Sequence, residues 1–199
     1  SIWLQQGDGP FAPDAAEVLR GAAALAARTI VRGLTAPSTE ALLVHRLFGA
    51  RGGGVDAPSL AGALNLPQTG KAAVIGFAAN TPGPHDLTDT SSTLRLLAGA
   101  FRRDSLVTVI ADRAYVLLPG YSTATAVTAW TRQLVREFET GRSVVLRAAI
   151  ALPVPDLAHV AGARAEVDRV LDGTAGSPES RVTTLAESRT AVLLGEVLD

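Results

Sequence analysis

The order of strand-like and helix-like segments after residue 71 constrains the fold of this chain most strongly. Short apolar runs alternate there with segments whose apolar residues recur at helical spacing. The first six elements are predicted as strand 72–78, helix 92–103, strands 106–111 and 114–118, helix 122–140 and strand 144–152. Only Asp112 and Arg113 separate the two middle strands, which indicates a tight hairpin. This split β-α-β-β-α-β order predicts an α+β, ferredoxin-like sheet with helices on one face.

Three more elements follow, a helix at 155–172, a strand at 181–185 and a final helix at 190–198. The first 70 residues instead predict an N-terminal helical segment. A short strand at 2–5 precedes a long Ala-rich helix that begins at Pro13-Asp14 and ends near Gly33. Helices at 40–48 and 57–64 then flank a glycine-rich loop at 49–54. The expected division is therefore 1–34, a helical connector at 35–70, and an α+β domain at 71–199.

Composition excludes several classes of function. The net charge is -1, the isoelectric point is about 6.3, and Arg102-Arg103 is the only adjacent basic pair. No basic face is evident, so this segment is not expected to contact DNA by itself. The absence of Cys excludes disulfides, thiolate catalysis and Cys-based zinc sites. No apolar run reaches the roughly 20 residues that span a bilayer, and no signal peptide or Met is present, so we expect a fragment of a cytoplasmic protein without a membrane partner.

Three short motifs resemble nucleotide or catalytic signatures, but each has a simpler interpretation. Residues 65–72 approximate a phosphate-binding loop, yet they lack its first glycine and its hydroxyl residue and precede a strand. Residues 120–124 approximate a nucleophile elbow, but Ser122 fits better as the cap of the next helix. Residues 49–54 could bind an anion through backbone N–H groups, although a flexible linker explains them better.

Histidine and acidic residues offer one further site. His85, Asp86 and Asp89 could together hold a metal ion, but a solvated loop with Asp89 or Ser91 capping the next helix is the favoured interpretation. His45 and His159 each lie in a predicted helix and are interpreted as packing or surface residues. No metal site and no cofactor is therefore expected.

Three stretches of sequence resemble a known family. They are VIADRAYVLLPGYS at 109–122, AAIALPVPDLAHVAGARAEVDRVLD at 148–172 and RVTTLAESRTAVLLGEVL at 181–198. Together they resemble the nucleotide-cyclase palm of GGDEF domains, in the degenerate form found in PucR/CdaR-type bacterial transcriptional regulators. Residues 1–32 resemble the last strand and exit helix of the GAF-like sensor that precedes the palm in such regulators. The resemblance implies a C-terminal helix-turn-helix that is absent from this sequence.

The resemblance also allows a test for enzymatic activity. An active palm holds Mg²⁺ with carboxylates at the end of its first strand and in its hairpin. Here the first strand ends in Gly76-Phe77-Ala78-Ala79, and Ala111-Asp112-Arg113-Ala114-Tyr115 occupies the place of Gly-Gly-Asp-Glu-Phe. Because Arg113 puts positive charge where a metal ligand belongs, no catalytic residue is assigned and the chain is not expected to be an enzyme.

The function implied is a non-catalytic regulatory and dimerisation segment that relays a signal to the absent helix-turn-helix. A homodimer is expected because regulators that bind palindromic DNA need two-fold symmetry; the helix at 14–32 and the apolar residues 191–198 are its candidate contact surfaces, although both could instead cover their own domain's core. The first alternative is a sensor of an unknown small-molecule effector, bound in a cleft that includes His85, Asp86, Asp112 and Arg113. The second alternative is a residual nucleotide-processing enzyme.

Overall fold

The computed structural model describes residues 15–35, 38–50, 56–67, 70–79, 87–142, 144–175, 181–188 and 190. The chain divides into two compact units, Ser1–Thr39 and Glu40–Asp199. The elements are α1 (Ala15–Thr35), α2 (Thr39–Leu47), α3 (Ala57–Ala63), β1 (Ala72–Ala79), α4 (Leu87–Phe101), β2 (Leu106–Ile110), β3 (Arg113–Pro119), α5 (Ala124–Arg142), β4 (Leu146–Val154), the 3-10 turn η1 (Leu157–His159), α6 (Val160–Gly173) and β5 (Val182–Thr184).

Helix α1 accounts for all described residues of the first unit except Ser38 and Thr39. Its described side chains, at 15–26, are exposed or half-buried, and Val18 and Leu25 are 62% and 66% exposed. These two residues are seven apart, so they lie on one face of the helix. The helix as described buries no apolar face of its own.

Within the described part of the second unit, five strands form one sheet in the order β2-β3-β1-β4-β5. Strand β1 pairs antiparallel with both β3 and β4, β2 and β3 form an antiparallel hairpin, and β5 pairs parallel to β4. This topology confirms the predicted α+β, ferredoxin-like palm, with β5 added beside β4.

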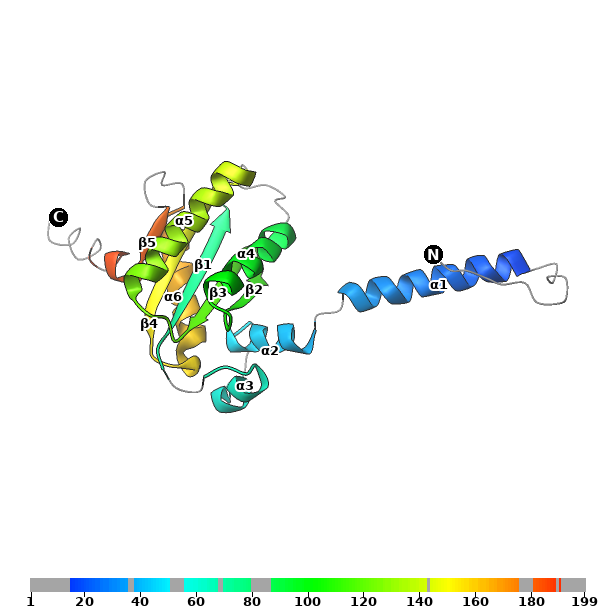
Figure 1. The fold of residues 1–199 in the computed structure, drawn as a ribbon, viewed down its shortest axis with the longest axis horizontal. Coiled ribbons are helices and arrows are strands. Elements are labelled where there is room, and N and C mark those ends of the chain that lie inside the picture. Colours follow the sequence, from blue (N-terminus) through cyan, green and yellow to red (C-terminus); the bar gives the residue numbers. More distant parts are fainter. Residues whose placement is uncertain are drawn as a thin grey trace. The chain divides into compact units, whose positions relative to one another are not determined.

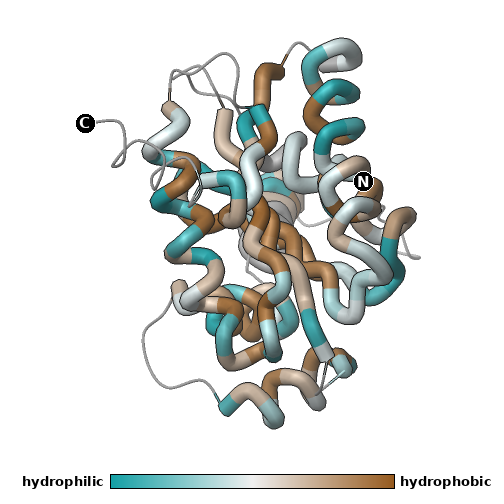
Figure 2. The backbone as a smooth tube through the Cα atoms, turned by 90° about the vertical axis from the view of Figure 1, so that its left-hand side faces the viewer, coloured by the Kyte–Doolittle hydropathy of each residue, from teal (hydrophilic) through white to brown (hydrophobic). Residues whose placement is uncertain are grey.

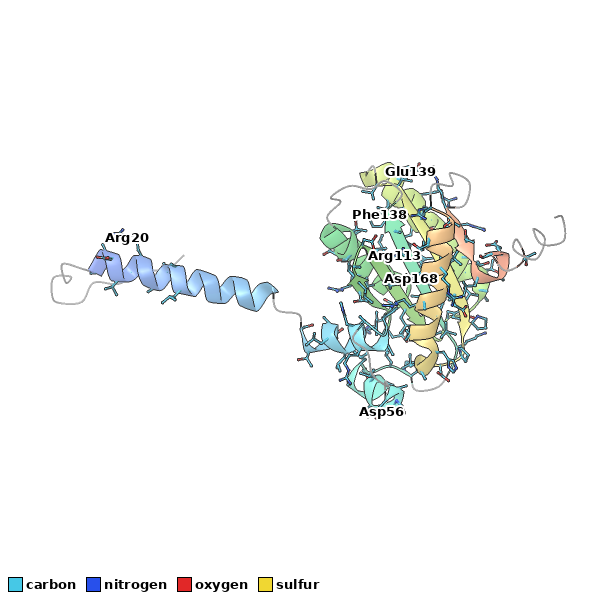
Figure 3. All side chains as sticks on the ribbon, turned by 180° about the vertical axis from the view of Figure 1, so that it is seen from behind. Arg20, Asp56, Arg113, Phe138, Glu139 and Asp168 are labelled. Carbon is cyan, nitrogen blue, oxygen red and sulfur yellow. The ribbon has the colours of Figure 1, made fainter. Side chains whose placement is uncertain are left out.

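Helices cover both faces of this sheet, whereas the sequence predicted helices on one face. Alternate residues of β1 explain how: Ala73, Ile75 and Phe77 pack with α4 and α5, while Val74 and Ala78 pack on the side of α6. Figures 1 and 3, seen from opposite sides, show α4 and α5 over one face and α6 over the other. Figure 2 accordingly shows the most hydrophobic stretches of backbone in the interior of the unit.

The helices predicted as a connector contribute to the core on the α6 side. The buried residues from α2, α3 and the turns after them are Val44, Leu47, Phe48, Leu60, Ala61 and Leu66. The centroid of the Phe48 ring lies 5.7 Å from the centroid of the Tyr115 ring on β3. From Glu40 onward the predicted connector is therefore part of the second unit.

Several predicted boundaries were wrong by a few residues. Helix α4 begins at Leu87 and not at 92, so Asp89 lies in its first turn and neither Asp89 nor Ser91 is its cap. Helix α5 is capped by Thr123, whose hydroxyl accepts a hydrogen bond from the Ala126 N–H at 3.1 Å, and not by Ser122. Strand β5 ends at Thr184, one residue before the predicted end at Leu185, and residues 185–188 are helical. The predicted strand at 2–5 and most of the predicted final helix lie outside the described residues. No helix in the described part of the chain is long and apolar enough to cross a membrane.

Candidate functional site

The β2–β3 hairpin turn contains a residue with an unfavourable backbone conformation. Ala111 has φ of 55°, a left-handed value that favours glycine, and it is the first of the two residues that connect the strands. A two-residue turn with positive φ at its first position has the type II′ pattern, in which glycine is preferred there. The turn projects Asp112 into solvent, with 87% of its side chain exposed, whereas the Arg113 side chain is only 18% exposed.

Strand register places a second arginine near Arg113. Ala78 of β1 pairs with Arg113 of β3 on one side and with Arg147 of β4 on the other. Residues that face each other across neighbouring strands point to the same side of a sheet, and Ala78 belongs to the core on the α6 side. Two guanidinium groups therefore flank the end of β1, beneath α6.

Helix α6 supplies the acidic partners of Arg113. Asp168 and Asp172 are four residues apart and thus share a helix face. Arg113 Nη1 lies 3.0 Å from Asp168 Oδ1 and donates to the Asp168 backbone oxygen at 3.2 Å. Arg113 Nη2 donates to Asp172 Oδ1. Figure 3 shows Arg113 and Asp168 next to each other where α6 crosses the sheet. The hairpin is thereby tied to α6 by charge-assisted hydrogen bonds.

Tyr115 and Arg164 complete the surroundings of Asp168. The Tyr115 hydroxyl donates to Asp168 Oδ1 at 2.6 Å, and Arg164 Nε lies 3.6 Å from Asp168 Oδ2. The Arg164 guanidinium also lies 5.9 Å from the centre of the Tyr115 ring, within the range of a cation–π contact. We refer to Arg113, Tyr115, Arg147, Arg164, Asp168 and Asp172 as the Arg113 cluster.

Arg147 binds the end of α6 by a different route. Its Nη1 donates to the backbone oxygen of Leu171, in the last turn of the helix. The carbonyl groups of a helix C-terminus carry partial negative charge and have no partner within the helix, so a buried guanidinium is favourable there. Burial lowers the pKa of Arg147, and the positive charge of Arg113 lowers it further.

The ionisation states within the cluster follow from these contacts. Burial alone would lower the pKa of Arg113, but hydrogen bonds and charge from Asp172 and Asp168 outweigh it, and the pKa of Arg113 is raised. Burial, and then the hydrogen bond to Asp168, raise the pKa of Tyr115. Near neutral pH the cluster thus contains a charged Arg113 and a neutral Tyr115. Neither side chain changes its protonation state in that pH range.

The predicted effector cleft is only partly within the described residues. His85 and Asp86 lie outside them, so the cleft itself stays a prediction. Of its other members, Asp112 faces solvent and Arg113 is engaged by α6, with 3.9 Å between Asp112 Oδ1 and Arg113 Nε. The described residues contain no group of three or more His, Asp or Glu side chains placed to hold a metal ion.

The remaining sequence candidates are scattered over the second unit. Ser122 is exposed beside the capping residue Thr123, and Asn65 adopts φ of 52° in the turn after α3. His45 is half-buried in α2. His159 Nδ1 lies 2.7 Å from Asp156 Oδ1, at the start of α6. The described structure does not bring these residues together into one site.

Sequence reasoning missed the acidic half of the Arg113 cluster. Arg164, Asp168 and Asp172 recur every four residues in the predicted helix, which marks one charged helix face. That spacing could have been noticed. The pairing of this helix face with Arg113 could not be predicted, because only the packing of α6 on the sheet brings Arg113 and Asp168 together.

Comparison with known proteins bears on this architecture. The sequence model of the GGDEF-like domain family matches residues 49–172, more than half of the chain. The chain belongs to the GGDEF-like domain family. The match begins just before α3 and ends at Asp172, so all six residues of the Arg113 cluster lie within the GGDEF-like domain.

Two solved structures are similar to the chain at low sequence identity. One is the active GGEEF domain of a diguanylate cyclase from Vibrio cholerae, with 13% identity, a TM-score of 0.46, and coverage of 70% of this chain and 94% of that one. The other is the coiled coil and GGDEF domain of DgcB from Caulobacter crescentus in complex with c-di-GMP, with 15% identity, a TM-score of 0.47, and coverage of 86% and 95%. No curated protein matches the sequence.

Proposed function

We propose that this chain is the non-catalytic regulatory and dimerisation segment of a PucR/CdaR-type transcriptional regulator. Its GGDEF-like domain would contribute shape and contact surfaces, and DNA would be bound by a helix-turn-helix outside residues 1–199. The observation that carries the proposal is the engagement of Arg113 at the hairpin by Asp168 and Asp172 of α6.

The chemistry of phosphoryl transfer explains why this observation matters. Enzymes that transfer phosphoryl groups from nucleotides rely on bound divalent cations to neutralise the charge that develops on the phosphate oxygens. Hard cations such as Mg²⁺ are bound by oxygen ligands, chiefly carboxylates. At the hairpin a guanidinium is held in place by carboxylates, and β1 ends in Ala78 and Ala79. A fixed positive charge at this position would repel Mg²⁺, which supports a role without catalysis.

A turnover assay tests the absence of catalysis. The full chain is incubated with GTP or ATP and Mg²⁺, and the nucleotides are separated by chromatography. We expect the substrate to be recovered unchanged. Formation of a cyclic nucleotide or dinucleotide that is lost in an Asp112→Ala variant would overturn the proposal, since Asp112 is the hairpin carboxylate exposed to solvent.

Helix α1 supports the dimerisation part of the proposal. Val18 and Leu25 are exposed on one face at the seven-residue spacing of a two-stranded coiled coil, with Ala22 between them. Burying two such residues against a second copy would remove apolar surface that the described helix leaves in water. We therefore expect α1 to pair with α1 of a second chain.

Light scattering at micromolar concentration tests this pairing. The unmodified chain should have the mass of a dimer, and a Val18→Glu/Leu25→Glu variant that of a monomer. Ala16→Glu/Ala23→Glu is the matched control, because it places the same two charges at the same spacing on the opposite face of α1. A monomeric unmodified chain, or equal masses for both variants, would contradict pairing through Val18 and Leu25.

A further inference from the structure

A groove on the second unit lies apart from the Arg113 cluster, since none of the six cluster residues lines it. It has a volume of about 440 Å³ and lies between the end of β4, η1, the first half of α6 and the helical residues after β5. Pockets that bind small molecules have volumes of roughly 300–1,000 Å³ and mostly apolar walls with a few polar groups. The lining residues here are all Ala, Gly, Val, Leu or Pro except His159 and Glu166.

Hydrogen bonds at both ends fix the wall of the groove that Leu185 and Ala186 form. These two residues lie between Thr184 and Glu187, which make a reciprocal capping box. The Glu187 carboxylate accepts from the Thr184 N–H at 2.8 Å, and the Thr184 hydroxyl accepts from the Glu187 N–H at 3.2 Å. Because this wall is already ordered, a ligand would bind without the cost of ordering it.

The two polar side chains lie at the two ends of the wall that α6 contributes. His159 directly precedes the helix, and Glu166 follows it by seven residues, or about 10 Å along the helix axis. Gly162 and Ala163 share their helix face and line the groove between them. The groove therefore has a stretch of small apolar side chains with one polar group at each end.

Both ends of the groove present hydrogen-bond acceptors. A carboxylate can accept about four hydrogen bonds, so Glu166 can bind an ammonium group in addition to its contacts within the protein. His159 Nδ1 lies 2.7 Å from Asp156 Oδ1, and this hydrogen bond is the first cause that lowers the pKa of Asp156, which is therefore charged near neutral pH. Since an ionised carboxylate only accepts, Nδ1 is the donor and Nε2 of the neutral ring is an acceptor. Among the described residues that line the groove, none is Arg or Lys.

We propose that this groove binds an aliphatic diamine, with its methylene chain against the small side chains of α6 and β4, one ammonium group at Glu166 and the other at His159 and Asp156. An anionic ligand would be repelled by Glu166, and a wholly apolar one would bury the polar ends without partners. A chain of about six methylene groups suits a separation of two helical turns. The site depends only on the groove, so it is tested separately from the proposed function.

Isothermal titration calorimetry of the full chain near neutral pH tests the binding of hexamethylenediamine. We expect saturable binding of one molecule per chain at micromolar to millimolar ligand. Hexylamine has the same chain but one ammonium group, and ethylenediamine has both ammonium groups on a chain too short for the groove. Each should bind at least tenfold more weakly. Absence of saturable binding, or equal affinities for hexamethylenediamine and ethylenediamine, would overturn the proposal, since equal affinities would mean attraction by net charge alone.

Two substitutions test whether the diamine lies in the groove. Gly162→Leu places a side chain in the groove where a Cβ has open space around it, and Gly99→Leu on α4, where a Cβ is equally unhindered, is its matched control. Glu166→Gln removes the carboxylate at one end, and Glu137→Gln removes one from the exposed surface of α5. We expect the two groove variants to bind hexamethylenediamine at least fivefold more weakly and the two controls to bind it as the unmodified chain does. Unchanged affinity in either groove variant that folds would overturn the proposal.

Discussion

Gly76, in the middle of β1, allows α6 to approach the sheet. A Cβ atom at this position would clash with Val167 Cγ1 and would lie 3.2 Å from Leu171 Cδ1 and 3.4 Å from Tyr115 Cε1. Val167 and Leu171 are fully buried, so neither side chain can move into solvent. The absence of a side chain at Gly76 thus sets the distance between α6 and the sheet, to which the Arg113 cluster joins α6 through β3 and β4.

The first prediction concerns Gly76. Gly76→Ala should lower the free energy of unfolding by about 1–3 kcal/mol, the usual cost of overpacking a core. Gly99→Ala, in the open surface of α4, should instead raise it by about 0.5–1 kcal/mol, because alanine favours a helix over glycine. Urea unfolding followed by circular dichroism measures both. An unchanged free energy of unfolding in Gly76→Ala would show that α6 packs less closely than described. The same conclusion would follow if adding Val167→Ala to Gly76→Ala did not recover part of the lost stability.

Ala111 is the second residue at which backbone geometry determines the outcome. Its φ of 55° costs an alanine about 1–2 kcal/mol, and a glycine avoids that cost while losing more entropy on folding. Ala111→Gly should therefore stabilise the domain by about 0.5–1 kcal/mol. The same change at Ala100, exposed within α4, should destabilise it by about 1 kcal/mol. Thermal unfolding distinguishes the two, and destabilisation by Ala111→Gly would contradict the turn geometry.

Tyr115 predicts a dependence of stability on alkaline pH. Its pKa is raised above the ordinary value of 10.0, by burial first and then by the hydrogen bond to Asp168. Below about pH 10 the phenol is neutral in both the folded and the unfolded chain, and its contribution is fully present. Above that pH the unfolded chain loses the proton first, so stability falls as the pH rises toward the folded pKa.

Replacing the phenol tests this assignment. Between pH 9.5 and about 11.5, Tyr115→Phe should show a shallower loss of unfolding free energy than the unmodified domain. Burial also raises the pKa of Tyr121, so Tyr121→Phe is the comparison that reveals how much of the slope belongs to each tyrosine. An unchanged slope in Tyr115→Phe would contradict a protonated phenol bound to Asp168.

At the scale of elements, ion pairs join the β2–β3 hairpin to α6. Arg113 begins β3, while Asp168 and Asp172 lie in the second half of α6, so their ion pairs join two elements that are more than fifty residues apart in sequence. Asp172 is 66% exposed and contributes little after solvent screening, whereas Asp168 is 24% exposed and accepts from both Arg113 and Tyr115. Asp168 is therefore the residue on which the connection mainly depends.

A comparison of adjacent hairpin residues tests that connection. Arg113→Ala should cost about 1.5–3 kcal/mol, because it leaves a half-buried carboxylate without its charged donor. Asp112→Ala should change stability by less than about 0.5 kcal/mol, since Asp112 is exposed and 3.9 Å from its partner. Equal effects of the two substitutions would mean that the hairpin is not anchored through Arg113.

How far the elements could be predicted depends on the range of the interactions that form them. The hairpin and the strand–helix order are encoded locally, by polar residues between two apolar runs and by the periodicity of apolar residues. The turn itself was predicted one residue too late, at Asp112-Arg113, whereas Ala111 and Asp112 connect the strands and Arg113 begins β3. The packing of α2 and α3 into the core on the α6 side depends on contacts between residues far apart in sequence, such as Phe48 and Tyr115. The cap of α5 at Thr123 in place of Ser122 shows the same limit at a boundary, since both residues have hydroxyl groups and only the path of the chain selects one.

At the scale of the whole molecule, two units carry different parts of the proposed role. The first is a helix whose exposed Val18 and Leu25 suit pairing with a second chain. The second is a GGDEF-like domain with helices on both faces of its sheet. Its hairpin is fixed by α6 through Arg113, Asp168 and Asp172. On the proposed account the chain would relay a signal without a chemical step of its own.

The account depends on Arg113 being a structural cation, and a double-mutant cycle measures that property most directly. Unfolding free energies of the unmodified chain, Arg113→Ala, Asp168→Ala and the double variant give the coupling between the two side chains. We predict a favourable coupling of about 1–2 kcal/mol, against less than about 0.5 kcal/mol for the exposed pair Arg132 and Glu187. Additive effects of Arg113→Ala and Asp168→Ala would contradict it and would leave the hairpin guanidinium free for another role.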